Sequence, residues 1–424
     1  MDPDELCDRY RAVRHRTEAL AAPLTAEDQQ LQAMPESSPV KWHRAHTTWF
    51  FETFVLVPRG FAPYDERFGR LFNSYYEAMG PRHARPHRGL LSRPTVNEVG
   101  LWRRQVDDKI LSLLEKPEAR DDTGLASLLQ LGLAHEEQHQ ELMVTDVLAA
   151  FACNPLAPVY LPWAARPQHE RLAPLGPTLW HEQPGGLAEI GANPGPFAFD
   201  NEGPRHKVWL APFALADRLV TVGAWTAFAR DGGYTTPSLW LAEGLDWVRA
   251  NGIESPAYTR REGDDVIVYG LGGERRTHPD EPILHLSFYE ADALATWLGA
   301  RLPTEQEWES VAVKAFAPDE ATGFDEDTPE GWRPLPPALE THQGLTGLFG
   351  RAWQWTRSDY APYPGYKPAE GAIGEYNGKF MVNQRVLRGS SAFTPPGHSR
   401  PTYRNFWHPQ TRFQLTGLRL ARDL

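Results

Sequence analysis

Apolar residues recur at helical spacing along four stretches in the first part of the chain. These stretches predict helices over residues 3–22, 38–57, 95–114 and 124–151. Ser38-Pro39 is read as an N-cap followed by a first-turn proline, and Thr95 with Glu98 forms a capping box. Four helices in succession predict a bundle, an architecture that builds metal sites from side chains on facing helices.

The pattern changes after this helical region. Seven prolines lie between residues 154 and 186 without sustained periodicity, and residues 161–186 are therefore predicted to be a linker between a bundle over 1–160 and a second domain over 187–424. Short segments rich in glycine, proline and tryptophan follow. Two capping boxes, Ser287 with Glu290 and Thr304 with Glu307, open helices there, and a final strand is predicted over Arg412–Arg422 with a bulge at Gly417. The expected class is α followed by α+β.

The amino-acid composition argues against several kinds of binding partner and site. The net charge is −12 and no long basic run occurs, which argues against nucleic acid and anionic membranes as partners. Cys7 and Cys153 are the only cysteines, so neither a disulfide scaffold nor a cysteine metal cluster is expected. No stretch reaches the roughly 18 apolar residues of a membrane span. The acidic N-terminus lacks the apolar segment of a signal peptide, and a cytoplasmic protein is expected.

The predicted helix over 124–151 carries the sequence HEEQH at 135–139. Residues four apart lie on one helix face, so His135 and His139 point the same way and can bind one metal ion. Three interpretations remain open at this point. The stretch can be an ordinary helix, a zinc hydrolase motif of the H-E-x-x-H type with Glu136 as general base, or a site for another metal.

A third ligand is predicted on the helix over 38–57. His43 and His46 lie three apart, and His46 occupies the more apolar register, so we predict that His46 is the ligand and that His43 is partly exposed. Three neutral imidazoles suit zinc, iron, copper or nickel. Glu136 is one residue, about 100°, away from His135 on the helix, which disfavours its use as a metal-site base.

Several longer motifs together resemble the ergothioneine-biosynthetic sulfoxide synthases. The resemblance covers nearly the whole chain, with the motifs in the family's order. It implies a DinB-like four-helix bundle followed by a domain similar to formylglycine-generating enzyme, which has a C-type-lectin-like fold. The motifs are WHRAHTTWFFE (42–52), FGRLFNSYYE (68–77), HEEQHQEL (135–142), CNPLAPVY (153–160), DNEGPRHKVWL (200–210), SFYEADA (287–293), RLPTEQEWE (301–309), EYNGKFM (375–381) and YRNFW…GLRLARD (403–423).

The resemblance implies a mononuclear non-haem Fe(II) enzyme that uses O₂. The reaction would join a sulfur donor, cysteine or γ-glutamylcysteine, to C2 of the imidazole of hercynine (Nα-trimethylhistidine) and give a sulfoxide. The implied iron ligands are His46, His135 and His139, in agreement with the helix geometry. No partner beyond these small molecules is expected.

The resemblance also implies residues that bind hercynine. Gln138 and Asn405 would hydrogen-bond its imidazole, since amide side chains both donate and accept. Phe406 and Trp407 would face the trimethylammonium group, because aromatic faces attract quaternary cations. Read without the resemblance, Phe406 and Trp407 are ordinary core aromatics.

The long loop at 58–93 holds further candidates, because a loop of this length inside a compact domain is often functional. The family places a tyrosine near the iron as a proton donor, and Tyr75 and Tyr76 both fit. Arg82, Arg85 and Arg88 would bind the carboxylate of the sulfur donor, a task that suits the guanidinium fork. Tyrosines packed in a core and solvated arginines are the alternatives.

Departures from the family pattern leave the donor open. His87 stands where the family has arginine, and the segments 221–225 and 388–393 also differ. Loss of an arginine would suit a sugar, as in the related selenoneine synthases, which attach selenium from a selenosugar to the same imidazole. Formylglycine-generating activity is disfavoured because residues 154–424 contain no cysteine. A lectin-like binding protein with a purely structural bundle also remains.

Overall fold

The computed structural model describes residues 3–120, 122–161, 175–316, 341–342, 344–368, 374 and 377–424. The described chain divides into an N-terminal helical unit, which ends at Tyr160, and a C-terminal unit that begins at Leu161. Half of the predicted linker, residues 162–174, lies outside the described residues. Its last part belongs to the C-terminal unit, since strand β1 (Trp180–Gln183) pairs there with β4 (Phe213–Leu219).

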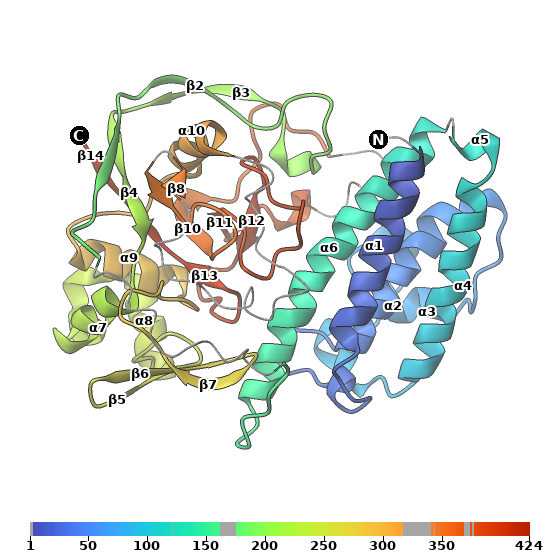
Figure 1. The fold of residues 1–424 in the computed structure, drawn as a ribbon, viewed down its shortest axis with the longest axis horizontal. Coiled ribbons are helices and arrows are strands. Elements are labelled where there is room, and N and C mark those ends of the chain that lie inside the picture. Colours follow the sequence, from blue (N-terminus) through green and yellow to red (C-terminus); the bar gives the residue numbers. More distant parts are fainter. Residues whose placement is uncertain are drawn as a thin grey trace. The chain divides into compact units, whose positions relative to one another are not determined.

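The N-terminal unit is a bundle of four long helices that run side by side (Figure 1). They are α1 (Pro3–Ala21), α2 (Val40–Phe51), α4 (Val96–Leu114) and α6 (Thr123–Ala152). Helix α2 continues into one π-helical turn at Glu52–Leu56. The short helices α3 (Phe68–Phe72) and α5 (Pro117–Arg120) lie in the connections. Trp42, Phe51, Trp102 and Leu133 are among the buried residues of the bundle core.

Local sequence signals explain two helix starts and fail at a third. Thr95 accepts from the Glu98 amide while Glu98 caps the Thr95 amide, so the predicted box opens α4. Asp122 caps α6 in the same way by accepting from the amide of Leu125. The prediction for Ser38 is wrong, because Pro39 is the N-cap of α2 and the Ser38 hydroxyl accepts a hydrogen bond from Arg88 instead.

The described part of the C-terminal unit combines small sheets with four α-helices. Strand β4 is central in an antiparallel sheet of order β1-β4-β14, in which β14 spans Arg419–Asp423. A second sheet has the order β12-β11-β10-β13, with β12 (Asn405–Trp407), β11 (Arg385–Arg388), β10 (Trp353–Asp359) and β13 (Thr416–Gly417). The helices are α7 (Val222–Arg230), α8 (Ala242–Asn251), α9 (Phe288–Trp297) and α10 (Glu305–Ala315).

Three smaller sheets also lie in the described part of this unit. β2 (Gly186–Ile190) pairs with β3 (His206–Leu210), and β8 (Thr341–His342) pairs with β9 (Leu345–Thr346). The third is an antiparallel meander of β5 (Thr259–Glu262), β6 (Asp265–Gly270) and β7 (Gly273–Arg276). Both predicted capping boxes are present, at the starts of α9 and α10.

The predicted final strand over Arg412–Arg422 is wrong as a single element. Its first part, β13, pairs in parallel with β10, whereas its second part, β14, pairs antiparallel with β4 in another sheet. The change of phase at Gly417 therefore marks the point at which the chain passes from one sheet to the other. Among the described helices, none is both long enough and apolar enough to cross a membrane.

Candidate metal centre

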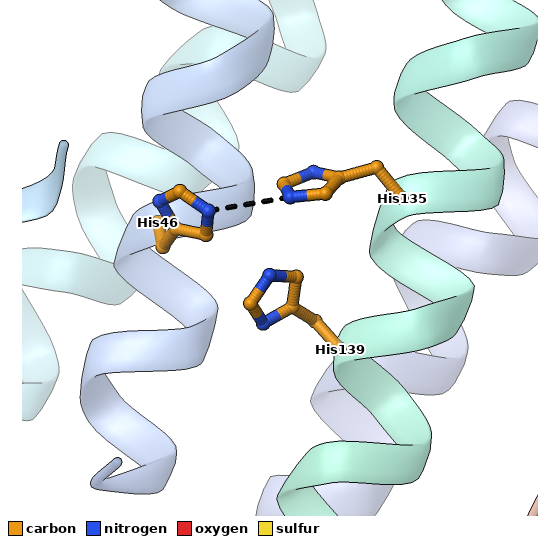
Figure 2. A group of neighbouring side chains, drawn as sticks. All are labelled: His46, His135 and His139. Atoms are coloured by element: carbon orange, nitrogen blue, oxygen red, sulfur yellow. Dashed lines mark hydrogen bonds between the residues drawn. The ribbon is translucent and has the colours of Figure 1, made fainter. Parts of the chain in front are cut away.

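Helices α2 and α6 bring three buried histidines together, His46 from α2 and His135 and His139 from α6 (Figure 2). We call these three the histidine cluster. Each offers one ring nitrogen, and these nitrogens lie within 4.8 Å of one another. Nε2 of His46 is 3.2 Å from Nε2 of His135. Two nitrogens that bind one ion at about 2.1 Å each lie no more than roughly 4.2 Å apart, so this pair already has a suitable separation.

The cluster is electrically neutral. Burial lowers the pKa of His135 to about 4 and lowers the pKa values of His46 and His139 well below the ordinary value. Neutral imidazoles keep a nitrogen lone pair for a metal, whereas imidazolium rings do not. Three buried neutral nitrogens within 4.8 Å of one another are a donor set that fits zinc, iron, copper or nickel.

The surroundings of His46 fix which nitrogen faces the cluster. Its Nδ1 lies 2.6 Å from the carbonyl oxygen of Phe72, so Nδ1 carries the hydrogen and Nε2 keeps its lone pair. The ring stacks on Trp42 with centroids 4.6 Å apart and on Trp49 with centroids 5.6 Å apart. Hydrogen bond and stacking together hold the orientation of this ligand.

The prediction that His43 is partly exposed is wrong. His43 is 2% exposed, and its Nδ1 lies 2.7 Å from Nδ1 of His139. Its Nε2 lies 3.0 Å from Oδ2 of Asp146. Burial lowers the pKa of His43, although Asp146 acts in the opposite direction, so the contact is a hydrogen bond of a neutral ring rather than an ion pair. His43 therefore contacts Nδ1 of His139, the ring nitrogen of His139 that faces away from the histidine cluster.

Glu136 is buried among cations and hydroxyls. Arg14 donates to its Oε2 at 2.8 Å, Thr17 donates to its Oε1 at 2.6 Å, and Arg103 also donates to Oε1. Burial raises the pKa of Glu136, but Arg103 and Arg14 outweigh this effect and hold it at about 2. A carboxylate of such low basicity is poorly suited to act as a general base near neutral pH. This geometry argues against the H-E-x-x-H hydrolase interpretation.

The two candidate tyrosines have different surroundings. Tyr76 is 3% exposed, and its ring packs against Trp49 and Phe54 in the bundle. Tyr75 is half-buried, and its hydroxyl oxygen accepts a hydrogen bond of 2.6 Å from Arg85. The phenol of Tyr75 therefore has a cationic partner.

The other two candidate arginines, Arg82 and Arg88, also differ from each other. Arg82 pairs with the exposed Glu77 at 2.7 Å. Arg88 is 3% exposed and lies over the ring of Trp42, 3.4 Å from its centroid. It donates to the hydroxyls of Ser38 and Ser74 at 2.9 and 3.1 Å. Burial and the neighbouring Arg85 lower the pKa of Arg88 to about 9.

The remaining candidates lie on α6 and on β12. Gln138 is half-buried on α6, three residues after His135. In the C-terminal unit, Phe406 stacks on Tyr360 with centroids 4.0 Å apart, and Trp407 packs edge-on against Phe413. Oδ1 of Asn405 accepts from the amide of Phe406 at 2.8 Å. Asn405, Phe406 and Trp407 are each half-buried, so part of every side chain remains accessible.

The sequence prediction missed Asp146 and the role of Ser38. Asp146 lies seven residues after His139, which is two helical turns along the same face, so periodicity could have found it. Its Oδ2 also accepts from the amide of Ser38 at 2.8 Å. No local pattern indicates that second contact, because the two residues are 108 positions apart.

Two family models match the chain. Residues 9–143 match the DinB superfamily, and residues 182–424 match the sulfatase-modifying factor enzyme 1-like domain. The order and the extent of both matches agree with the fold class expected from the motifs.

Relatives of known name match over different lengths. A hercynine oxygenase of Mycolicibacterium smegmatis is 31% identical over 99% of both chains, and one of Mycobacterium tuberculosis is 31% identical over 100% of this chain and 99% of its own. A formylglycine-generating enzyme of Thermomonospora curvata is 29% identical over 41% of this chain and 68% of its own. With full-length similarity to the first two and both domains in the same order, the chain belongs to the hercynine oxygenase family of ergothioneine-biosynthetic sulfoxide synthases.

Proposed function

We propose that this protein is a non-haem Fe(II)- and O₂-dependent enzyme that oxidises hercynine and forms a carbon–sulfur bond at C2 of its imidazole. The observation that carries the proposal is the buried, neutral histidine cluster in a chain that resembles hercynine oxygenases over its full length. The overall reaction replaces the C2–H and S–H bonds by a C–S bond. One oxygen atom of O₂ goes to sulfur, which gives the sulfoxide, and the other leaves as water.

His46, His135 and His139 would hold the metal through their neutral nitrogens. Bound Fe(II) would supply the redox chemistry with O₂ that side chains lack. Three protein ligands also leave room at the ion for other ligands, as in other catalytic metal sites. Burial of the three rings keeps bulk water from competing for the same nitrogens.

Four residues would bind hercynine. Gln138 is offset from His135 by three residues on α6, so its amide can reach an imidazole placed next to the metal. Asn405 offers a second amide, while Phe406 and Trp407 offer aromatic faces to the trimethylammonium group. Tyr360 and Phe380 both stack on Phe406, with centroids 4.0 and 5.9 Å away, so Phe406 belongs to an aromatic cluster that would attract the cation.

Tyr75 is the better of the two candidate proton donors. After a phenol gives up its proton, the remaining oxygen is anionic and needs a positive partner. Arg85 already donates to the Tyr75 oxygen, whereas the Tyr76 ring packs among Trp49 and Phe54. We therefore assign proton donation to the Tyr75 hydroxyl.

Arg82, Arg85 and Arg88 would bind the carboxylate of the sulfur donor, cysteine or γ-glutamylcysteine. Each already has partners within the bundle: Glu77 for Arg82, the Tyr75 hydroxyl and the Glu36 carbonyl for Arg85, and two serine hydroxyls for Arg88. These existing contacts leave the three arginines less available to a carboxylate, and His87 stands where the family has arginine. Both observations favour a second candidate donor that has no carboxylate. The corresponding reaction is that of a selenoneine synthase, with a selenosugar as donor.

Anaerobic loading with Fe(II), followed by O₂ and substrates, tests the proposal. Oxygen uptake should require hercynine together with a donor, and mass spectrometry should show one donor joined to the imidazole. A panel of cysteine, γ-glutamylcysteine and a selenosugar decides between a sulfur donor and a selenium donor. The proposal fails if the iron-loaded protein neither binds hercynine nor consumes oxygen with any donor. Peptide cleavage by the zinc-loaded protein would support the hydrolase alternative instead.

A further inference from the structure

A chain of hydrogen bonds leads away from the histidine cluster on the side of His139. Nδ1 of His139 contacts Nδ1 of His43 at 2.7 Å, and Nε2 of His43 contacts Oδ2 of Asp146 at 3.0 Å. The amide of Ser38 donates to the same Oδ2 at 2.8 Å. His139, His43, Asp146 and Ser38 are all buried, with exposures between 2% and 8%, so water does not compete for these bonds.

Only one arrangement of protons in this chain suits a metal. If His43 donates through Nε2 to the Asp146 carboxylate, its Nδ1 must accept, and His139 must donate from its own Nδ1. The lone pair of His139 then lies on Nε2, the nitrogen that faces His46 and His135 in Figure 2. In the reverse arrangement His43 donates to His139, whose Nε2 then carries a hydrogen and cannot bind an ion.

We propose that His43 and Asp146 are positioning residues that fix His139 as the Nδ1-protonated tautomer and thereby direct its Nε2 lone pair to the metal. The inference rests on the metal site of the proposed function and extends it to residues that touch no substrate. Asp146 cannot take this role directly, because seven residues of α-helix separate it from His139 by roughly 10 Å along the axis. His43, on the facing helix α2, bridges that distance.

His46 provides a comparison within the same cluster. Its Nδ1 hydrogen is held by the neutral carbonyl of Phe72, whereas the His139 chain ends on a carboxylate. Both contacts select the same tautomer, but only the second connects a ligand to a negative charge. Outer partners of this kind typically change metal affinity by 10- to 100-fold, since they orient the ring and raise its basicity.

Four variants of the full-length chain separate hydrogen bonding from filling of space. His43→Leu removes both hydrogen bonds, whereas His43→Gln keeps an acceptor for His139 and a donor for Asp146. Asp146→Leu and Asp146→Asn form the matched pair at the other end, since the Asn oxygen can still accept from Ser38 and His43. We expect both Leu variants to weaken Co(II) binding about 10- to 100-fold, and both amide variants to stay within a few-fold of the wild type.

Proton NMR of the Co(II)-loaded protein gives a readout that loss of packing alone would not produce. Ring N–H protons of ligand histidines are strongly shifted by the ion, and a buried hydrogen-bonded N–H exchanges slowly with water. We expect His43→Leu to abolish the slow exchange of the His139 signal and to leave the His46 signal, held by Phe72, unchanged. Thermal unfolding of the metal-free proteins identifies any variant that fails to fold, in which case the Asp146 pair decides.

Equal Co(II) affinity of wild type and folded His43→Leu would overturn the proposal. An equal loss in the Gln and Leu variants would overturn it as well, because the side-chain hydrogen bonds would then not matter. Wild-type turnover with hercynine is measured separately. A wild type that binds Co(II) but never oxidises hercynine disproves the proposed function without affecting the positioning role.

Discussion

Helix α6 has two buried faces whose side chains differ in charge. On one face, His135 and His139 are uncharged, and their ring nitrogens lie close to that of His46. On the other, the neighbouring Glu136 is 0% exposed and fully ionised, with Arg14 and Arg103 as partners. The histidine face is uncharged and keeps nitrogen lone pairs for a metal. The Glu136 face is charged, and both carboxylate oxygens already accept hydrogen bonds.

This difference implies that one face of the helix can bind a metal and that the other stabilises the fold. A buried ion pair whose hydrogen bonds are complete has nothing left to offer a ligand, and breaking it leaves uncompensated charges. A cluster of neutral imidazoles costs less to bury and retains its affinity for a metal. We therefore expect substitutions on the histidine face to change metal binding, and substitutions on the Glu136 face to change the free energy of unfolding.

The largest effect should come from His135→Ala or His139→Ala. Each removes one of three ligands, so Fe(II) affinity should fall by more than about 100-fold, the upper end for partners outside the ligand set. Hercynine-dependent oxygen uptake should disappear at micromolar iron. Metal analysis after gel filtration and an oxygen electrode measure the two quantities. Exposed His15→Ala on α1 is the matched control and should behave as wild type; full iron occupancy in His135→Ala would contradict the ligand assignment.

Glu136→Gln should leave metal binding intact and lower stability. Arg14 and Arg103 would lose their buried anion, which typically costs about 3–5 kcal/mol. Urea unfolding of the metal-free protein gives the free energy, and iron content per folded molecule gives the binding. If the folded variant instead loses hercynine-dependent oxygen uptake but keeps its metal and its stability, Glu136 has a chemical role in the reaction.

The two faces should lose stability in different ranges of pH. The unfolded chain protonates His135 near its ordinary pKa of 6.5, whereas the folded, metal-free protein keeps it neutral down to about 4. The unfolded state therefore binds more protons between these values, and the free energy of unfolding falls as the pH drops through this range, by about 3 kcal/mol for this residue. Glu136, ordinarily at 4.5 and held at about 2, loses its contribution only below pH 4.5.

Urea midpoints at a series of pH values test this separation. His135→Phe should make the dependence between pH 6.5 and 4 shallower by the share of His135, while His46 and His139 keep theirs, and it should leave the dependence below pH 4.5 in place. Glu136→Gln should do the reverse. Identical pH profiles for both variants would show that the two faces are not independent.

The smallest effect is expected for Thr17→Val. The change removes the hydrogen bond to the Glu136 carboxylate and the one that Thr17 accepts from Gln140, and it keeps the shape of the side chain, so stability should fall by about 1.5–3 kcal/mol. Metal affinity should not change, because the hydroxyl lies on the Glu136 face. Altered Co(II) affinity in a stable Thr17→Val protein would show that the two faces communicate through the helix.

Local features were predictable from the sequence, and contacts between distant segments were not. The capping boxes at Thr95, Ser287 and Thr304 are confirmed, because each depends on residues three positions apart. The bundle and the meeting of His46, His135 and His139 followed from helical periodicity. The division of Arg412–Arg422 between two sheets did not, because it depends on β4 and β10 far away in the chain.

The failures at Ser38 and His43 have the same origin. Ser38 was expected to cap its own helix, yet its hydroxyl bonds Arg88 and its amide bonds Asp146. His43 was expected at the surface because its register is less apolar than that of His46, yet Asp146 and His139 satisfy its polar atoms in the interior. A polar residue can lie in a core when distant partners complete its hydrogen bonds, and a single sequence does not display those partners.

The stacking of His46 between Trp42 and Trp49 has an optical consequence. Both indoles lie within 6 Å of the ring that would bind the ion, at 4.6 and 5.6 Å between centroids. Indole fluorescence is quenched by a transition metal with an unfilled d shell at such distances and is little affected by zinc, whose d shell is full. Emission from these two tryptophans should therefore fall on addition of Fe(II) or Co(II) and persist with Zn(II), so the protein carries a built-in optical reporter of which metal it holds.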